Sequence, residues 1–473
     1  MSVSEEIVVD WCSQLIAESP DFPSLEICLD AIPPLDAFAD LPAGTRVLVR
    51  GDTDVVVDEK GQIAEDIRLQ SLVDTLKYGA ARKWIQILYG HRGRDPELSL
   101  EPVARHLQRL LREQGLPQQE VSFVGEWMDD ANGTILDSAA QTISQLPGGS
   151  IVVLENTRRY KLEQALWKAK PADLSKLAPR LTRYANEMHD KLAAVHVNEG
   201  FASSNRDLSS TLVPLTMDRF ALGKYIDLEL RQYVTRARLS ELVIFSGLKI
   251  NKLDDLEAIL QRGQLRMVIA AGSLAMALKK AAADLDGQVF EMGVAGDNSK
   301  PDSKIYIPPD RIAQARGMIE HARSHGGEFV LPIDFIMADG QASDVIPAGG
   351  AQFDVGPKTI ALQSAKIGEF IEYHNRKVAA GNGPAAAFHN GVFGMFEKEE
   401  FANGTRKFME ELKRMHTAGV QVYVGGGEGG AALLRYGDES WVTHLFTAGG
   451  TILKALGTEP IPYIKALYLA AKR

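Results

Sequence analysis

Residues 46–54 read Arg-Val-Leu-Val-Arg-Gly-Asp-Thr-Asp, a short apolar run that leads directly into two aspartates. An apolar run of this length predicts a strand buried on both faces. Polar residues placed directly after such a strand are typical of ligand sites at the carboxyl edge of a parallel sheet. Taken alone, the stretch fits equally well a strand followed by a solvated acidic turn.

Similar apolar runs recur along the chain and alternate with helical patterns. Between two of these runs, Val103, Leu107, Leu110 and Leu111 lie on one helical face by their spacing. This alternation predicts an α/β fold, with parallel sheets connected by crossover helices. The expected strands cover residues 47–49, 85–88, 121–124, 151–154, 193–197, 242–245, 267–270, 329–336, 385–388, 420–424 and 442–446.

The length of 473 residues allows two or three domains, each with a full core. We expect a first domain over residues 1–219, beginning with a leader (residues 1–42) that carries no chemistry. A charged, helix-compatible stretch over residues 220–238 is expected to join it to a second domain over residues 239–458. Residues 459–473 are expected to pack back on the first domain.

The composition limits the classes of partner and compartment. With 62 acidic and 52 basic residues, the formal charge of -10 opposes binding to nucleic acid or to an anionic membrane surface. Cys12 and Cys28 are too few for a disulfide framework or a CxxC metal site. The sequence has neither a signal-peptide pattern at its start nor an apolar run near the ~18 residues that span a bilayer. We therefore expect a cytoplasmic protein.

Cationic side chains are distributed singly through the first half of the chain, in polar or Gly-containing stretches. Three of these stretches directly follow a predicted strand, so the fold is expected to gather them at one sheet edge around a small, multiply charged anion. An isolated arginine is more often a solvated surface residue, and it is the recurrence that favours a site. The five residues are Arg68, His91, Arg94, Arg158 and Arg206.

The second half places glycines after strands, where backbone N–H groups can hold phosphates. Gly425, Gly427 and Gly430 fit the GxGxxG pattern of a dinucleotide site. That pattern expects an acidic residue at the end of the next strand, and residues 447–451 offer none. No Walker A sequence is present, so a phosphate-binding turn and a merely tight turn both remain open.

Taken in chain order, these segments resemble the phosphoglycerate kinase family over roughly residues 44–465. Residues 50–56 are similar to the family pattern Arg-Val-Asp-Phe-Asn-Val-Pro, and residues 66–69 to Asp-x-Arg-Ile. Residues 90–95 are similar to Ser-His-Leu-Gly-Arg-Pro, 155–160 to Glu-Asn-Leu-Arg-Phe-His, and 205–208 to His-Arg-Ala-His. In the second half the similar segments are 246–250, 354–359, 390–397, 425–429 and 447–451.

The resemblance implies two Rossmann-like domains with an interdomain cleft, in a monomer that uses 3-phosphoglycerate and ATP or ADP with Mg²⁺. It implies that Arg68, Lys249 and Lys252 are catalytic, with Arg68 reaching the transferred phosphoryl group. The residues implied to bind 3-phosphoglycerate are Asp52, Asp54, His91, Arg94, Arg158 and Arg206.

The same resemblance implies a nucleotide site in the second half, with Glu428 as the metal ligand. The backbone of Gly427, Gly449 and Gly450 is implied to stabilise the transition state. The implied nucleotide-binding residues are Gly247, Lys249, Lys358, Asn390, Gly391, Glu397, Gly425, Gly426, Gly427 and Gly429.

Several positions depart from the family pattern. Asp54 stands in place of Asn, Glu428 in place of Asp, and Gly429 in place of Ser or Thr. Val392 replaces a Pro, and residues 270–272 replace a Gly triplet. A reversible phosphoglycerate kinase is the first interpretation. The alternatives are a non-catalytic binding or regulatory relative and, because of Asp54, a kinase for another carboxylate.

Overall fold

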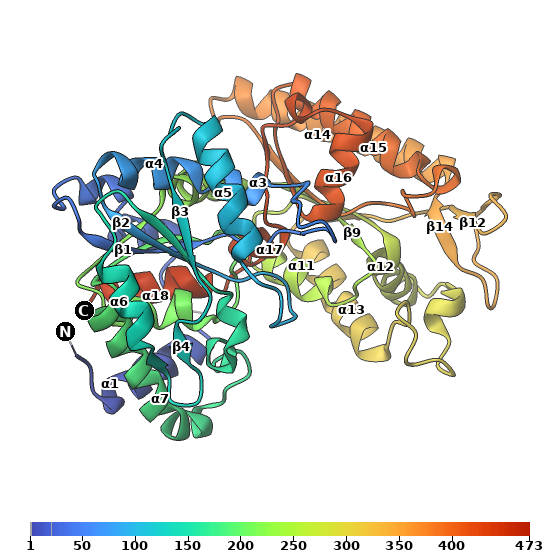
Figure 1. Ribbon diagram of the computed structural model, residues 1–473. Helices are drawn as coiled ribbons and strands as arrows, with labels where there is room; N and C mark the ends of the chain where they lie inside the picture. Colours follow the sequence, from blue (N-terminus) through green and yellow to red (C-terminus); the bar gives the residue numbers. More distant parts are fainter. Residues whose placement is uncertain (1, 20) are drawn as a thin grey trace. The chain divides into compact units, whose positions relative to one another are not determined.

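The computed structural model describes residues 2–19 and 21–473. The chain divides into two compact units, one formed by Met1–Gln232 with Glu459–Arg473 and the other by Tyr233–Thr458. Each unit is built around a parallel six-stranded sheet (Figure 1). The predicted α/β class with parallel sheets is therefore confirmed.

The sheet of the first unit has the strand order β3-β6-β2-β1-β7-β8, and every neighbouring pair is parallel. The side chains of its central strand β1 enter two cores alternately. Leu48 packs on one face of the sheet, and Val47 and Val49 pack on the other. The strands are β1 (Arg46–Gly51), β2 (Ile85–Tyr89), β3 (Val121–Val124), β6 (Ile151–Leu154), β7 (Val195–Glu199) and β8 (Arg219–Leu222), with a separate hairpin of β4 (Met128–Asp129) and β5 (Thr134–Ile135).

Helices cover both faces of this sheet (Figure 1). The face that carries Val47 and Val49 is covered by α4 and α5, and the opposite face by α1, α6, α7 and α18. The helices are α1 (Glu5–Ile16), α2 (Leu25–Ala31), α3 (Ile67–Gln70), α4 (Val73–Ala81), α5 (Glu101–Glu113), α6 (Asp137–Ser144), α7 (Leu174–Glu187), α8 (Leu208–Thr211), α9 (Lys224–Leu228) and α18 (Pro462–Ala471).

The two ends of the chain meet in the first unit. In the C-terminal helix α18, the ammonium of Lys465 donates to the Ala17 carbonyl at 3.0 Å and to Ser19 Oγ at 2.6 Å. In the N-terminal helix α1, the Trp11 indole donates to the Thr211 carbonyl at 2.9 Å. The residues predicted as a leader are thus part of this unit's core.

The second unit repeats the architecture with the strand order β11-β10-β9-β15-β16-β17, again parallel throughout. A three-stranded antiparallel sheet, in the order β13-β12-β14, is added to it. The strands are β9 (Leu242–Gly247), β10 (Met267–Ala271), β11 (Glu328–Val330), β12 (Phe335–Met337), β13 (Ala342–Ser343), β14 (Gln352–Val355), β15 (Ala386–Asn390), β16 (Gln421–Gly425) and β17 (His444–Leu445).

The helices of the second unit follow the strands that they connect. In Figure 1, α14, α15 and α16 lie on one side of its parallel sheet and α11, α12 and α13 on the other. The bounds are α10 (Thr235–Ala237), α11 (Lys252–Leu260), α12 (Gly272–Leu285), α13 (Pro309–Ser324), α14 (Pro357–Ala379), α15 (Asn403–Thr417), α16 (Gly427–Tyr436) and α17 (Gly449–Leu456).

Two predicted elements are wrong in detail. The strand expected over residues 329–336 is two strands, β11 and β12, which belong to different sheets. Pro332 separates them, and proline cannot donate a ladder hydrogen bond. The helix expected from residue 220 does not begin there, because residues 219–222 form β8 beside β7 and helix α9 starts at Lys224.

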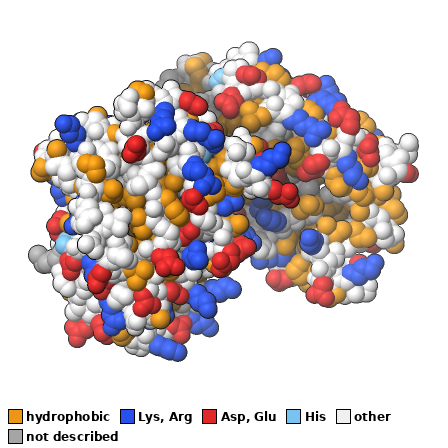
Figure 2. Space-filling model, viewed as in Figure 1, with side chains coloured by type: hydrophobic (Ala, Val, Ile, Leu, Met, Phe, Trp, Pro, Cys, Tyr) orange, Lys and Arg blue, Asp and Glu red, His pale blue; other side chains and the backbone are white. Residues whose placement is uncertain are grey.

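The surface carries charges of both signs. Figure 2 shows Lys and Arg side chains interspersed with Asp and Glu over the face in view. Among the residues described, no helix is both long and apolar enough to cross a membrane.

Candidate active site

Most of the polar residues predicted in the first half gather at the carboxyl edge of the first sheet. Asp52 follows β1, His91 follows β2 and Arg158 follows β6. These three strands are adjacent and parallel, so their ends lie side by side. The structure therefore brings together residues that are far apart in the sequence.

Arg68 and two aspartates form one corner of this edge. The Arg68 guanidinium lies 3.3 Å from Asp54 Oδ2 and 3.9 Å from Asp52 Oδ1, and it donates to the Asp54 carbonyl at 2.9 Å. The other oxygen of Asp54 accepts from the Gly93 N–H at 2.7 Å. Asp54 is thus paired with Arg68, and not with the Arg94 or Arg206 side chains that share its predicted site.

Asp52 is more enclosed than Asp54. Its side chain is 3% exposed, and Oδ2 accepts from the backbone N–H of Ala202 at 3.1 Å. Burial raises the pKa of the Asp52 carboxyl, and the charge of Arg68 opposes this effect. A buried carboxylate beside Arg68 can fix the direction of that guanidinium.

His91 is held as a neutral imidazole. Arg50 Nη2 lies 3.0 Å from His91 Nδ1, and because an arginine can only donate, Nδ1 must accept. Burial, and then the nearby charge of Arg50, lowers the pKa of His91 well below its usual value. The remaining proton is therefore on Nε2, which lies 3.8 Å from Asp54 Oδ2.

Arg158 and Arg206 are anchored on the opposite side of the edge. Arg158 donates to the Gly93 carbonyl at 3.0 Å, and its guanidinium lies 5.0 Å from the ring centre of Trp167. Arg206 donates to the carbonyls of Trp167 at 2.8 Å and Ile16 at 3.4 Å. Arg94 is exposed, and it makes no hydrogen bond or ion pair with any residue described. The structure therefore gathers four of the five residues predicted as cations, although the positive charge predicted for His91 is wrong because its buried ring is neutral. The exposed Arg94 directly follows Gly93, whose backbone bonds to Asp54 and Arg158.

The second unit holds a polar cluster at the carboxyl ends of β9, β15 and β16. The Lys252 ammonium donates to the Ser246 carbonyl and to Asn390 Oδ1, both at 2.9 Å. Asn390 Nδ2 in turn donates to the Gly425 carbonyl at 2.8 Å. Burial lowers the pKa of Lys252, and the neighbouring charge of Lys249 adds to that effect. This chain of bonds ties the lysine to the glycine-rich turn.

The backbone of this turn explains its composition. Gly426 has φ +96°, and a Cβ there would lie 2.6 Å from Asn390 Nδ2. A Cβ on Gly449 would lie 2.4 Å from the Cα of Gly426. Helices α16 and α17 begin at Gly427 and Gly449, and the first N–H groups of a helix have no partner within it. Two helix N-termini thus lie at this turn, and a helix N-terminus suits phosphate oxygens.

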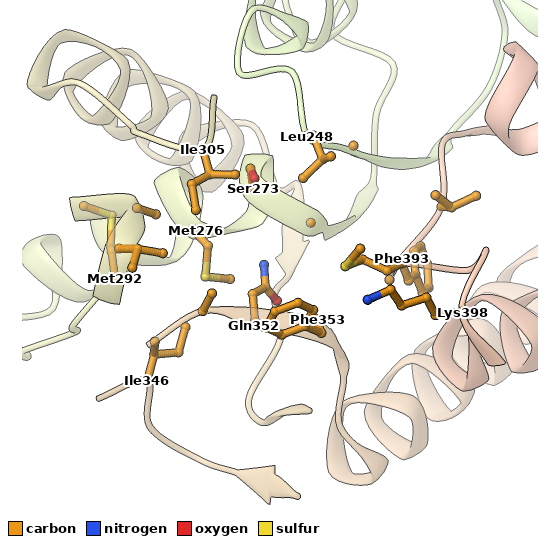
Figure 3. Close-up of a pocket in the computed structure, with 18 of the residues that line it drawn as sticks. Leu248, Ser273, Met276, Met292, Ile305, Ile346, Gln352, Phe353, Phe393 and Lys398 are labelled. Atoms are coloured by element: carbon orange, nitrogen blue, oxygen red, sulfur yellow. The ribbon is translucent and has the colours of Figure 1, made fainter. Parts of the chain in front are cut away.

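A cavity of ≈ 360 Å³ lies beside these residues. In Figure 3, Met276 from α12, Phe353 from β14 and Phe393 line it together with Ile346. The carboxylate-bearing residues Glu397 and Glu428 belong to the same wall, as do Gly247 and Leu248. The cavity is apolar over most of its lining, and Glu397, Lys398 and Glu428 add charged groups, as is typical of small-molecule sites.

The other predicted residues of the second half are distributed less tightly. Lys249 is exposed two residues after β9, while Gly391, at φ +101°, passes directly over the Ser246 carbonyl. Gly429 is buried in α16, and Gly450 lies in the first turn of α17. Lys358 differs from the rest, because its ammonium pairs with Asp344 at 2.6 Å on an exposed surface.

A family model described as phosphoglycerate kinase matches residues 39–459. The chain belongs to the phosphoglycerate kinase family. The phosphoglycerate kinase of Candida glabrata is 29% identical over 444 residues, which cover 89% of this chain and 95% of that protein. The cytosolic phosphoglycerate kinase of Nicotiana tabacum is 27% identical over 455 residues, 91% and 96% of the two chains.

Solved phosphoglycerate kinases share the fold. The enzyme from Pyrococcus horikoshii matches with a TM-score of 0.70 at 20% identity, over 93% of this chain and 100% of that one. The enzyme from Coxiella burnetii matches with a TM-score of 0.66 at 22% identity, over 92% and 98%. The resemblance to this family that the motifs indicate is confirmed.

Two residues of the first site were not singled out from the sequence. Arg50 directly follows the strand predicted over residues 47–49, and the structure buries it fully. Asp207 is also fully buried and lies 3.6 Å from Arg158 Nη2. A signal for Asp207 existed, because the family pattern His-Arg-Ala-His has alanine at this position.

Proposed function

We propose that this phosphoglycerate kinase transfers a phosphoryl group reversibly between ATP and the carboxylate of 3-phosphoglycerate. The first unit is proposed to bind the acceptor and the second the nucleotide. The observation that carries the proposal is the convergence of Arg68, His91, Arg158 and Arg206 at one sheet edge. Three of these side chains are cations and His91 is a neutral N–H donor, and such a set suits a small anion.

The chemistry requires positioning and charge stabilisation. The acceptor carboxylate is ionised at neutral pH and attacks the γ-phosphoryl group without a general base. Negative charge then spreads over the equatorial oxygens of the transferred group. We assign Arg68 to this charge from the acceptor side, and Lys252 with the N-termini of α16 and α17 from the nucleotide side.

His91 contributes in its neutral form. With Nδ1 accepting from Arg50, its Nε2–H is directed toward the side of the site that holds Asp54. A neutral donor can bind a ligand oxygen without changing the charge of the site. We therefore assign His91 to acceptor orientation and not to proton transfer.

The residues present fit a Mg²⁺ ion that arrives with the nucleotide. Over the described part of the chain, no group of three or more His, Cys, Asp or Glu side chains is arranged to hold a metal alone. Mg²⁺ commonly uses one or two protein carboxylates with phosphate oxygens and water, so a single carboxylate at the cavity is sufficient. We assign Glu428 to this role, and the ion, when bound, offsets the charge of the phosphates.

The compartment and the oligomeric state are further parts of the proposal. We infer a cytoplasmic monomer, and the name of the tobacco relative, which includes the word cytosolic, supports the compartment.

We also propose that Lys249, Gly247, Gly391, Glu397 and the glycines of α16 and α17 bind the nucleotide. Lys358 is a weaker member of its set, because its ammonium pairs with Asp344 on an exposed surface. Arg94 is retained as an acceptor-binding residue.

Titration calorimetry with two crossed variants tests the assignment of the two units. We expect Arg158→Met to weaken 3-phosphoglycerate binding at least about tenfold and to leave Mg-ADP binding unchanged. We expect Lys252→Met to have the opposite pattern, since its ammonium belongs to the cluster around Asn390. Loss of both ligands in either variant, with the fold retained, would contradict the division of roles.

A further inference from the structure

Asp207 places a carboxylate inside the cationic site of the first unit. Its side chain is fully buried, and Oδ1 accepts from the Trp167 indole N–H at 2.7 Å. Oδ2 lies 3.6 Å from Arg158 Nη2 and 3.7 Å from Arg50 Nη2. Among the described residues, Oδ2 has no hydrogen-bond partner, because these separations exceed hydrogen-bond length.

Arg50 does not need Asp207 for its hydrogen bonds. Its Nε donates to Ser209 Oγ at 2.8 Å, Nη2 donates to Ser203 Oγ at 2.8 Å, and Nη1 donates to the Gly51 carbonyl at 2.5 Å. A second buried acid, Glu163, accepts from Ser209 beside it. The guanidinium of Arg50 is therefore fully engaged beneath the site and is not available to a ligand.

Arg158 is in a different position. One of its terminal nitrogens is fixed by the Gly93 carbonyl, and the other, Nη2, is directed toward Asp207 without closing a hydrogen bond. Its Nε is also buried without a partner among the residues described. Arg158 thus retains donor capacity, but the field of its charge is already offset by a carboxylate within 4 Å.

The other two clustered arginines differ in the charge of their partners. Arg68 is offset by Asp54, whereas Arg206 is held by two carbonyl groups, which carry no net charge. Two of the site's three clustered arginines that can meet a ligand therefore have a carboxylate partner. The site binds an anion with much less net positive charge than the count of arginines suggests.

We propose that Asp207 is a specificity-determining residue, which competes with the acceptor anion for Arg158 and shifts preference toward acceptors of lower negative charge. The proposal rests on the function proposed above and refines it. A phosphorylated hydroxy acid carries a carboxylate and a phosphate of about two further charges, while an unphosphorylated hydroxy acid carries one charge in all. The carboxylate of Asp207 must therefore disfavour the first class more than the second.

The test compares the wild-type chain with Asp207→Asn, which keeps the shape and an oxygen to accept from Trp167. The probes are 3-phosphoglycerate and glycerate, with dissociation constants measured by calorimetry at low salt. We expect 3-phosphoglycerate to bind about tenfold more tightly to the variant, and glycerate less than about threefold more tightly. Asp137→Asn is the charge-matched control, because Asp137 is 94% exposed and pairs with Lys191, and it should change neither constant.

A double-mutant cycle with Arg158→Met separates competition from a purely structural role. In the Arg158→Met background, Asp207→Asn should change the ratio of the two constants by a smaller factor, because the competition for Arg158 is gone and only the direct repulsion between Asp207 and the ligand remains. The double variant replaces both Arg158 and Asp207, so no unpaired member of the ion pair is left buried. It therefore also provides a folded comparison if Asp207→Asn alone is unstable. With Arg158 replaced, an Asp207→Asn change that still alters the ratio as in the wild-type background would overturn the proposal.

The outcomes distinguish this inference from the proposed function. If the wild-type chain binds 3-phosphoglycerate and Asp207→Asn leaves the ratio unchanged, the inference is wrong and the function stands. If neither protein binds 3-phosphoglycerate at millimolar concentration while both remain folded, the proposed function fails and the inference falls with it. If the variant gains 3-phosphoglycerate binding by a larger factor than glycerate binding and the control gains neither, both are supported.

Discussion

Replacing Arg68 with alanine separates catalysis from stability at one position. The Arg68 side chain is 29% exposed and its partner Asp54 is 34% exposed, so the ion pair lies largely within reach of solvent. Pairs of this kind contribute about 0–1 kcal/mol to folding. Because Arg68 also offsets the buried Asp52 at 3.9 Å, we expect the free energy of unfolding to fall by somewhat more than that. In the role proposed for Arg68, its contact with the transferred phosphoryl group is made mainly in the transition state, so turnover should fall by a factor of order 10³, or about 4 kcal/mol.

The assay couples product formation from 3-phosphoglycerate and Mg-ATP to a spectrophotometric readout, with kcat and KM determined separately. We expect the KM for 3-phosphoglycerate to change less than about threefold. Arg105→Ala is the matched control, because Arg105 is an exposed arginine paired with Glu101 in the same unit. A kcat within about threefold of the wild type in Arg68→Ala would refute the role given to this residue.

Two further predictions concern the metal and the buried acid of the first site. Glu428→Gln should weaken Mg-ADP binding at least about tenfold and spare 3-phosphoglycerate; an unchanged affinity for Mg-ADP in calorimetry would remove Glu428 from the metal site. Burial raises the pKa of Glu163 from an ordinary value of 4.5 to about 7, so the folded protein holds a proton that the unfolded chain releases above its own pKa. The contribution of Glu163 to the free energy of unfolding should therefore fall as pH rises from 4.5 to about 7, by at most about 1.4 kcal/mol per pH unit. Glu163→Gln should flatten this part of the pH profile in urea unfolding followed by tryptophan fluorescence, and an identical profile in the two proteins would contradict the assignment.

The alternation of strands and helices could be predicted because burial leaves a direct mark on the sequence. Residues 47–49 and 151–154 are apolar runs, since strands at the centre of a parallel sheet are covered on both faces. The prediction of a single strand over residues 329–336 was wrong, because apolar composition does not show where the chain leaves one sheet and enters another. Pro332 was the available signal.

The site could be predicted only as a set of residue types at strand ends. His91 and Arg158 converge because parallel strands end at one edge, which the pattern does indicate, whereas Arg68 comes from helix α3. Motif similarity does not give side-chain direction, and Lys358 matches a family position while its ammonium pairs with the exposed Asp344. The pairing of carboxylates with the site's arginines depends on distances across the fold, so it was not visible in the sequence.

Asp207 illustrates this limit most clearly. In the sequence it is a spacer beside Arg206, and an acidic residue before a short helix is ordinary. In the structure it is fully buried against the arginines of the site, where its charge affects every anion that binds. The effect of Asp instead of the family's Ala at position 207 therefore depends on the burial of the carboxylate, which the sequence does not show.

Trapping the product with hydroxylamine tests the central claim most directly. Transfer to the carboxylate of 3-phosphoglycerate gives an acyl phosphate, which hydroxylamine converts to a hydroxamate, whereas a phosphate ester does not react. We predict hydroxamate formation that requires the chain, Mg-ATP and 3-phosphoglycerate together and that falls with Arg68→Ala. Consumption of ATP without hydroxamate, or no consumption by the folded wild-type chain, would contradict the account.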